Sequence, residues 1–217
     1  MKFSASLSSL GKTLRRLQGV VWVLALVGYF GPWIGHDAAA LAWNAYDLFD
    51  IARFLPPVES GALTVNIQAL RLPLIGLAVL IPMFFCRAPF WQRGLVALLG
   101  SVLALSTLPP YPQILTAWRT PGWRVPFWWS IGALGGIGAV ALAGSRLARL
   151  APWLTVAWAA MMGIPAYVTF SRLRPLIRAL HAASIQVGWG YWMCGLGLAL
   201  LATSAWLEGL VLSQEGA

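Results

Sequence analysis

The chain has 217 residues, of which 59% are hydrophobic and only 10% are charged, and its mean hydropathy is +0.75. A soluble domain carries about a quarter charged residues, so this composition excludes an ordinary soluble enzyme or binding domain. The net charge of +9 comes from bases that lie at the ends of apolar runs, where they meet lipid headgroups. No basic surface with interleaved aromatic residues is left outside those runs, so nucleic-acid binding is not expected.

Six apolar segments follow one another along the chain. We expect each to be a membrane-spanning helix, because lipid cannot satisfy free backbone polar groups. The predicted spans are residues 17–35, 69–86, 94–108, 125–143, 150–170 and 187–212. The fold class is therefore all-α: a polytopic membrane helical bundle forming one domain over residues 1–217, with short interfacial helices in the outer loops.

Three of these segments are ambiguous in sequence. The first has a small-x-small pair after it, Ala38 and Ala40, as a signal peptide does, and we interpret it as a retained helix. The second contains Arg71, and the third is shorter than the roughly 20 residues that a spanning helix needs.

The distribution of Lys and Arg predicts the orientation of the chain. An even number of spans puts both termini on one side, and that side holds eight bases against seven on the other. The basic start of the chain, with Lys2, Lys12, Arg15 and Arg16, favours the cytoplasm for both termini. We predict a multi-pass protein of the bacterial cytoplasmic (inner) membrane.

Polar chemistry is concentrated in the loop formed by residues 36–68. Four of the six acidic residues lie there, namely Asp37, Asp47, Asp50 and Glu59. From Ala38 to Leu55, apolar residues recur at spacings of three and four, so we predict a helix lying flat at the interface with its apolar face down.

A second amphipathic stretch covers residues 171–186. Pro175 is typical of the first turn of a short helix. Arg174, Arg178 and His181 follow the spacing i, i+4 and i+7 and so share one helix face. The predicted topology puts this basic face on the same side as the acidic loop. We expect Arg174 or Arg178 to pair with Asp37, Asp47 or Asp50, contributing up to about 1 kcal/mol.

These two loops supply the candidate ligand-binding residues, which are His36, Asp37, Asp47, Asp50, Arg174, Arg178 and His181. They include ligand types used for zinc and iron, but neither HExxH nor a His-x-His spacing occurs, so no metal or other cofactor is predicted. A Ser-His-Asp set with Ser184 or Ser60 lacks the GxSxG elbow, so no catalytic residue is predicted.

Glu208 lies in the last apolar run, where an ionised carboxylate is costly. If the helix ends near Trp206, Glu208 is interfacial, and this is the interpretation we favour. Otherwise it is the best candidate for a buried partner of an arginine, or for proton coupling. In the fourth span, glycines at 132, 135, 136 and 138 leave one side nearly bare. We favour packing of another helix of the same chain there over contact with a second subunit.

Several short patterns carry a resemblance to a known group of proteins. They are Gly31-Pro32-Trp33-Ile34-Gly35-His36, Ala38-Ala39-Ala40-Leu41, Asp47-Leu48, Phe54-Leu55-Pro56-Pro57-Val58 and Gly188-Trp189-Gly190-Tyr191-Trp192. Together they resemble a family of bacterial polytopic membrane proteins to which no activity is attached. The resemblance implies a membrane fold and brings no reaction, cofactor or partner with it.

Three functions fit this sequence. The first is a non-catalytic membrane subunit, embedded in a transport system; six helices in about 200 residues look like the substrate-capturing subunits of vitamin uptake systems. The second is a structural subunit of a larger membrane complex. The third is an enzyme acting on lipid or an isoprenoid carrier at the outer interface, with Arg119, Arg124, Arg174 and Arg178 holding a phosphate and Asp47 or Asp50 as acid or base. The partners expected are membrane lipids, other membrane subunits and a small-molecule ligand.

Overall fold

The protein is described by a computed structural model over residues 2–35, 42–181 and 185–215, with side chains described for 10–35, 42–179 and 185–214. The elements are α1 (Lys2–Phe30), β1 (Pro32–Gly35), β2 (Trp43–Asn44), α2 (Ala45–Ala52), α3 (Pro56–Glu59), η2 (Ile67–Arg71), α4 (Leu72–Phe84), α5 (Phe90–Leu105), η3 (Gln113–Leu115), α6 (Pro121–Ala143), η4 (Gly144–Leu147), α7 (Ala151–His181), β3 (Gln186–Val187) and α8 (Trp189–Glu215). The predicted helical architecture is confirmed, with three very short strands added to it.

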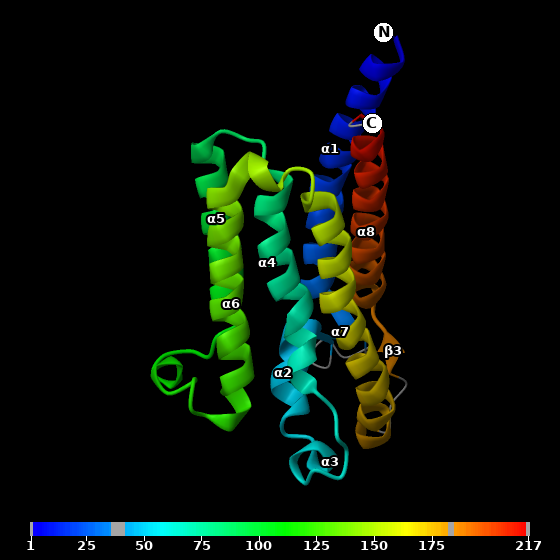
Figure 1. The fold of residues 1–217 in the computed structure, drawn as a ribbon. Coiled ribbons are helices and arrows are strands. Elements are labelled where there is room, and N and C mark those ends of the chain that lie inside the picture. The colour runs from blue at the N-terminus through cyan, green and yellow to red at the C-terminus, as the bar shows by residue number, and fades with distance from the viewer. Residues whose placement is uncertain (1, 36–41, 182–184, 216–217) are drawn as a thin grey trace.

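The long helices stand side by side, and α4 runs through their middle (Figure 1). Helices α5 and α6 flank it on one side, and α1, α7 and α8 on the other. Every residue from Leu72 to Met83 is buried, so α4 has no outward face and no amphipathic period. Such an all-round apolar helix is typical of the interior of a bundle.

The chain alternates between the two ends of this bundle. Both termini, the turn between α4 and α5 and the turn between α6 and α7 lie at one end, which we call the terminal end (Figure 1). Helices α2 and α3, the start of α4 and the lower part of α7 lie at the opposite end, which we call the loop end.

Helices α1 and α8 pack antiparallel along most of their length. Small residues allow their backbones to approach. A Cβ atom added at Gly28 would lie 2.3 Å from the Cys194 backbone nitrogen, and one added at Gly197 would lie 2.8 Å from Ala25 Cα. Without a hydrophobic driving force between helices in lipid, such close backbone contact is a main source of helix association.

A three-stranded antiparallel sheet of order β2-β1-β3 joins these two helices at the loop end. Strand β1 directly follows α1, and β3 directly precedes α8. Trp33 on β1 is fully buried against Tyr167, Phe170 and Tyr191, with ring centroids 5.3 to 5.4 Å away. Trp33 and Phe170 are therefore core residues, while Tyr167 and Tyr191 are half-buried at the edge of this aromatic cluster.

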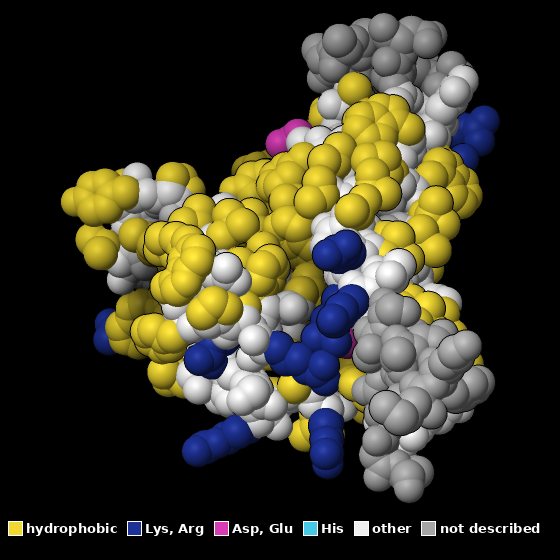
Figure 2. Space-filling view, turned by 90° about the horizontal axis from the view of Figure 1, so that it is seen from above, with side chains coloured by type: hydrophobic (Ala, Val, Ile, Leu, Met, Phe, Trp, Pro, Cys, Tyr) yellow, Lys and Arg dark blue, Asp and Glu magenta, His cyan; other side chains and the backbone are white. Residues whose placement is uncertain are grey.

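Large hydrophobic side chains cover much of the outside of the molecule, as the end view in Figure 2 shows. Four helical segments are long and apolar enough to cross a membrane: Ile67–Phe84, Pro121–Leu147, Ala151–Ala179 and Trp189–Gln214. Helix α5 is apolar but shorter, and α1 begins with a basic stretch. The chain therefore has the surface and the helices of a membrane protein.

Several predicted boundaries differ from the structure. The first span is a helix from Lys2 that ends at Phe30, because residues 32–35 form β1. The predicted separate helix in 171–186 is wrong: Pro175 lies inside α7, which continues to His181. The predicted 38–55 helix is described only as α2, which begins at Ala45; residues 38–41 lie outside the described residues.

The apolar side of α2 is present as predicted, but protein covers it. Ala45, Leu48, Ala52 and Leu55 are all buried in the core cluster of the bundle. The interpretation that this face rests on the membrane is therefore wrong. The start of α2 is fixed by Asn44, whose side-chain oxygen accepts a hydrogen bond of 2.8 Å from the Asp47 backbone N–H.

The glycine side of α6 also differs from expectation. A Cβ atom added at Gly132, Gly135 or Gly138 would meet no described atom within 4 Å. Only Gly136 approaches another helix, with Val79 at 3.8 Å from its added Cβ. The prediction that another helix of the chain covers this side is wrong for those three positions.

Candidate functional site

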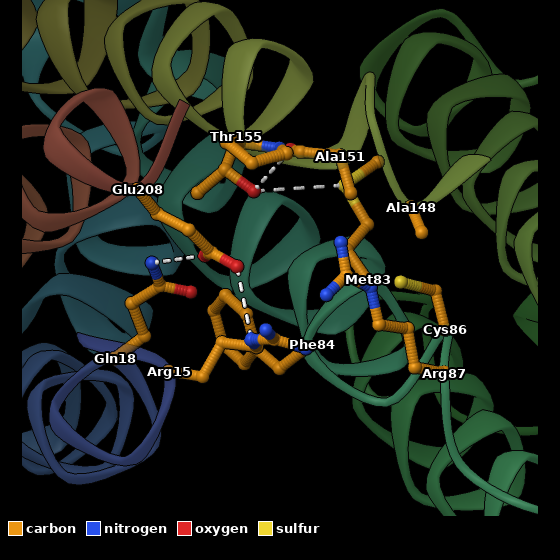
Figure 3. A pocket seen from close by; sticks show the side chains of 11 residues that line it. Arg15, Gln18, Met83, Phe84, Cys86, Arg87, Ala148, Ala151, Thr155 and Glu208 are labelled. Carbon is orange, nitrogen blue, oxygen red and sulfur yellow. Dashed lines mark hydrogen bonds and ion pairs between the residues drawn. The ribbon is translucent and has the colours of Figure 1, made fainter. Parts of the chain in front are cut away.

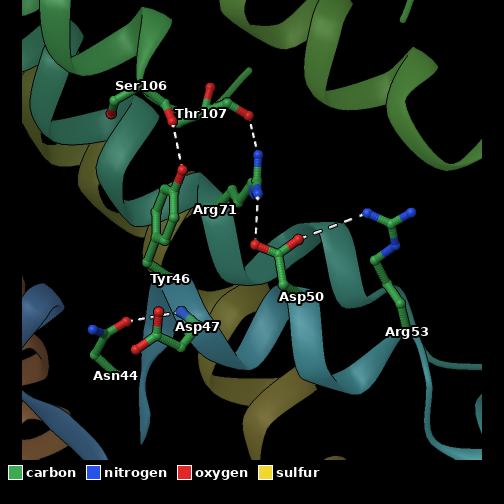
Figure 4. A network of polar contacts seen from close by, with 8 residues as sticks. All are labelled: Asn44, Tyr46, Asp47, Asp50, Arg53, Arg71, Ser106 and Thr107. Atoms are coloured by element: carbon green, nitrogen blue, oxygen red, sulfur yellow. Dashed lines mark hydrogen bonds and ion pairs between the residues drawn. The ribbon is translucent and has the colours of Figure 1, made fainter. Parts of the chain in front are cut away.

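A buried arginine lies at the loop end, at the start of the central helix. Arg71 is 1% exposed and is the residue that precedes α4. Its Nη2 atom lies 3.5 Å from Asp50 Oδ2 on α2, and its Nη1 donates to the Thr107 carbonyl that follows α5 (Figure 4). We call Arg71, Asp50 and Thr107 the arginine site. It ties together elements that are far apart in the chain.

Aromatic rings surround the same guanidinium. Arg71 Cζ lies 3.8 Å from the Phe49 ring centre, 4.7 Å from that of Trp123 and 5.1 Å from that of Tyr46. A desolvated cation–π contact contributes about 2 kcal/mol, against about 0.5 to 1 kcal/mol at an exposed site. The rings therefore compensate part of the cost of burying this charge. The charge itself adds to the positive end of the α4 dipole, so it also needs a carboxylate nearby.

Asp50 connects this buried charge to water. Its side chain is 45% exposed, and its Oδ1 atom lies 3.7 Å from Arg53 Nη1. Burial raises the pKa of the Asp50 carboxyl, while the guanidinium groups of Arg71 and Arg53 oppose that shift. Since the net direction is upward, attraction to the two arginines does not repay the dehydration of the carboxylate. The pair is therefore weak evidence for a role in stability.

Two more polar contacts lie next to the arginine site. The hydroxyl groups of Thr107 and Ser130 lie 2.6 Å apart and are both buried. Tyr46 donates a hydrogen bond of 2.9 Å to the Ser106 carbonyl (Figure 4). Within the described residues, Arg71 Nε and the Tyr29 hydroxyl are buried without a hydrogen-bond partner. Elsewhere in the described part of the bundle, Arg93 Nε and Trp158 Nε1 are also buried without a hydrogen-bond partner, so such donors are not special to the arginine site.

The predicted ligand-binding residues are only partly brought together. Asp50 belongs to the arginine site, and Asp47 is exposed one turn earlier on α2. Arg174 and Arg178 are exposed on α7. His36 and Asp37 lie outside the described residues, and His181 ends α7 with a side chain that is not described.

The predicted pairing of Arg174 or Arg178 with Asp47 or Asp50 is wrong for the described residues. Asp50 pairs with Arg53 and Arg71 instead, and Arg174 and Arg178 form no ion pair there. The reason is reach: α2 packs on η2 and the core, so its carboxylate meets the arginine that precedes α4. Asp37 lies outside the described residues, so its pairing stays a prediction.

Sequence reasoning missed Arg71 as a site residue, although a signal was present. An arginine inside an otherwise apolar segment is itself a functional hypothesis, because a charge within a bilayer is costly. The prediction treated Arg71 only as a feature that makes the second span ambiguous.

A second buried charge lies at the terminal end. Glu208 on α8 is 5% exposed; its Oε1 lies 2.9 Å from Arg15 Nε, and its Oε2 accepts a hydrogen bond of 3.0 Å from Gln18 (Figure 3). We call Glu208, Arg15 and Gln18 the glutamate site. Helix α8 does not end near Trp206, as the favoured interpretation requires, but continues to Glu215. Glu208 is buried by the protein and paired with an arginine, as in the alternative interpretation.

The glutamate site borders a small cavity of about 10 Å³, also lined by Met83, Cys86, Arg87 and Thr155. This volume is about that of a single water molecule, so no organic ligand fits there. Among the residues that the structure describes, no group of three His, Cys, Asp or Glu side chains suitable for a metal ion occurs.

Comparison of the chain with protein-family models, with curated proteins and with solved structures gives no match. The resemblance of residues 31–58 to bacterial polytopic membrane proteins therefore stays a prediction.

We predict that Asp50→Asn leaves the free energy of unfolding within about 1 kcal/mol of the wild type at neutral pH. The variant removes a carboxylate whose ionisation is disfavoured in the folded state and keeps an acceptor for Arg71. Because the folded pKa is raised, the stability that Asp50 contributes is complete below its ordinary pKa and is lost as the pH rises through the folded pKa. Denaturant unfolding in micelles should show the wild type gaining on the variant upon acidification. A loss of several kcal/mol at neutral pH would instead make the pair a support of the fold.

The glutamate site should respond asymmetrically to substitution. Arg15→Gln leaves Glu208 buried without its cation and should cost about 3 kcal/mol. Glu208→Gln leaves Arg15, whose side chain is 26% exposed, free to turn to water, and should cost about 1 kcal/mol. The double variant should resemble Glu208→Gln. Unfolding of the three variants in the same detergent checks this order, which equal losses for the two single variants would contradict.

Proposed function

We propose that this protein is a non-catalytic integral membrane component of a transport system, with its ligand recognised at the loop end. The observation that carries the proposal is the arginine site: a fully buried guanidinium behind a carboxylate that reaches water. Buried ionisable groups within membrane bundles most often mark the path or the binding site of a ligand or ion. The raised pKa of Asp50 shows that ionisation of this carboxyl is disfavoured in the folded protein. The pair is therefore better explained by a functional role than by a contribution to stability.

The proposal includes six membrane crossings, by α1, α4, α5, α6, α7 and α8. Helix α5 has 16 residues and so a length of about 24 Å, which is short for a hydrocarbon core of about 30 Å. Local thinning of the bilayer accommodates such a mismatch at modest cost. In α1 the charge of Arg15 is paired with Glu208. Both termini then lie on one side, and the basic start of α1 favours the cytoplasm of a bacterium.

The enzyme alternative loses support from the same contacts. Arg119 and Arg124 do line one groove, of about 440 Å³, with Trp118 and Trp128. Asp50, the proposed acid or base, is held by Arg53 and Arg71 and does not line that groove. A structural role in a larger complex keeps one observation in its favour, which is the uncovered glycine side of α6.

The test is affinity purification of the tagged full-length chain from membranes of its own organism. We expect an ATPase or a second permease to co-purify in fixed proportion, and a small solute to raise the melting temperature of the purified complex. The double variant Arg71→Met with Asp50→Ala should keep the fold and the complex and lose the response to the solute. Asp47→Asn, which changes an exposed carboxylate on the same helix, is the matched control and should keep the response.

Two results would overturn the proposal. One is a stable monomer that takes no partner and shows no thermal response to solutes. The other is a full response to the solute in the double variant, which would place recognition away from the arginine site.

A further inference from the structure

A largely apolar groove that two arginines help to line lies between α1 and the end of α4. It has a volume of about 500 Å³ and is lined by Arg15, Arg16, Gly19, Val20, Val23, Phe84 and Phe85. It is separate from the arginine site, and it adjoins the small cavity beside Glu208, with which it shares Arg15 and Phe84. Its walls are partly exposed, with Val20 at 60% and Val23 at 50%.

The residues of α1 in this groove follow a single helix face. Arg16, Gly19, Val20 and Val23 are spaced i, i+3, i+4 and i+7, so the charge stands at one end of an apolar strip. From Arg16 to Val23 the helix rises about 10 Å. Helix α1 runs from the terminal end towards the loop end, so Arg16 precedes Val23 in that direction. This order, charge outside and apolar surface inside, matches a phosphate followed by the first part of an acyl chain.

Arg15 is held in place for such a contact. Its Nε atom is used by Glu208 at 2.9 Å and by the Gly11 carbonyl at 3.4 Å. Within the described residues its two Nη atoms make no hydrogen bond. The ion pair thus fixes the guanidinium and leaves its outer donors available. Guanidinium donors in this geometry suit phosphate oxygens.

Glycine 19 gives the groove its depth. A Cβ atom added there would meet nothing within 4 Å, so the space in front of the helix is open. The charges at this end are complementary to an anionic headgroup. Two positive charges, on Arg15 and Arg16, lie here beside one negative charge, on Glu208, and Arg87 lines the adjoining cavity. The local charge is therefore positive.

We propose that this groove binds one anionic phospholipid, with its phosphate on Arg15 and Arg16 and one acyl chain along Gly19, Val20, Val23 and Phe85. This inference uses the proposed crossing of α1 and is independent of transport. The lipid closes over the side of the glutamate site and so covers the charge pair that joins α1 to α8.

Native mass spectrometry of the full-length protein tests this site, with dioleoylphosphatidylglycerol and dioleoylphosphatidylcholine offered at equal concentration. The wild type should retain one phosphatidylglycerol in preference to phosphatidylcholine. Arg16→Gln should weaken phosphatidylglycerol binding about fivefold, as expected for one base at a membrane surface. Gly19→Leu fills the open space and should remove the bound lipid of either kind. Glycerol phosphate, which has the anionic group without the chains, should not compete.

Two matched variants separate this site from general effects. Arg149→Gln removes the same charge from an exposed position at the same end of the bundle, and Gly138→Leu adds the same side chain at an open position on α6. Both should bind phosphatidylglycerol as the wild type does. The proposal is overturned if Arg149→Gln weakens binding as much as Arg16→Gln, if Gly19→Leu retains the lipid, or if glycerol phosphate displaces it. Since this readout requires neither a transport partner nor a solute, its failure is distinct from failure of the proposed function.

Discussion

The rest of the structure depends on the complete enclosure of α4. Helices in lipid gain little from apolar contact as such, so enclosure has to come from close packing. Gly76 allows close packing of α4 against α7, because an added Cβ would lie only 2.8 Å from Met162 Cβ. Gly100 on α5 allows close packing of α5 against α4, because an added Cβ would lie only 2.5 Å from the Ala78 carbonyl oxygen. That carbonyl precedes Pro82 by four residues, and Pro82 has no N–H to offer it.

One charge pair lies near each end of α4. Arg71, which directly precedes the helix, is buried and needs a partner from a neighbouring element. At the other end Phe84 is half-buried and Phe85 is 38% exposed, and the pair there joins α1 to α8. At the loop end Asp50 of α2 meets Arg71, and at the terminal end Glu208 of α8 meets Arg15 of α1. In each pair one member is buried and the other reaches water. Such an arrangement neutralises a buried charge and keeps its partner accessible to protons, ions and other solutes in water.

The sequence predicted those features that depend on local pattern. Apolar length located α1, α4, α5, α6, α7 and α8 as helices, of which four segments are long and apolar enough to cross a membrane. The spacing of Ala45, Leu48 and Ala52 identified the apolar side of α2, which is buried. It also marked Glu208 as unusual. It did not predict what Asp50 pairs with, because a partner depends on how α2 packs on η2. It did not predict strands of two to four residues, since a period of two is not recognisable over so short a length. Pro175 was taken as a helix start, whereas Pro is tolerated inside a packed helix when neighbours support it.

The central claim is that six helices cross the bilayer, so that the loop end and the terminal end lie on opposite sides. It is tested most directly by labelling Ser60→Cys and Ser145→Cys, both at exposed positions, in a chain whose Cys86 and Cys194 are replaced by Ala. Three helices, α4, α5 and α6, separate these positions, so in sealed vesicles an impermeant maleimide should label only one of them, and both after permeabilisation. Labelling of both in sealed vesicles would contradict the claim, because an even number of these three helices would then cross the bilayer.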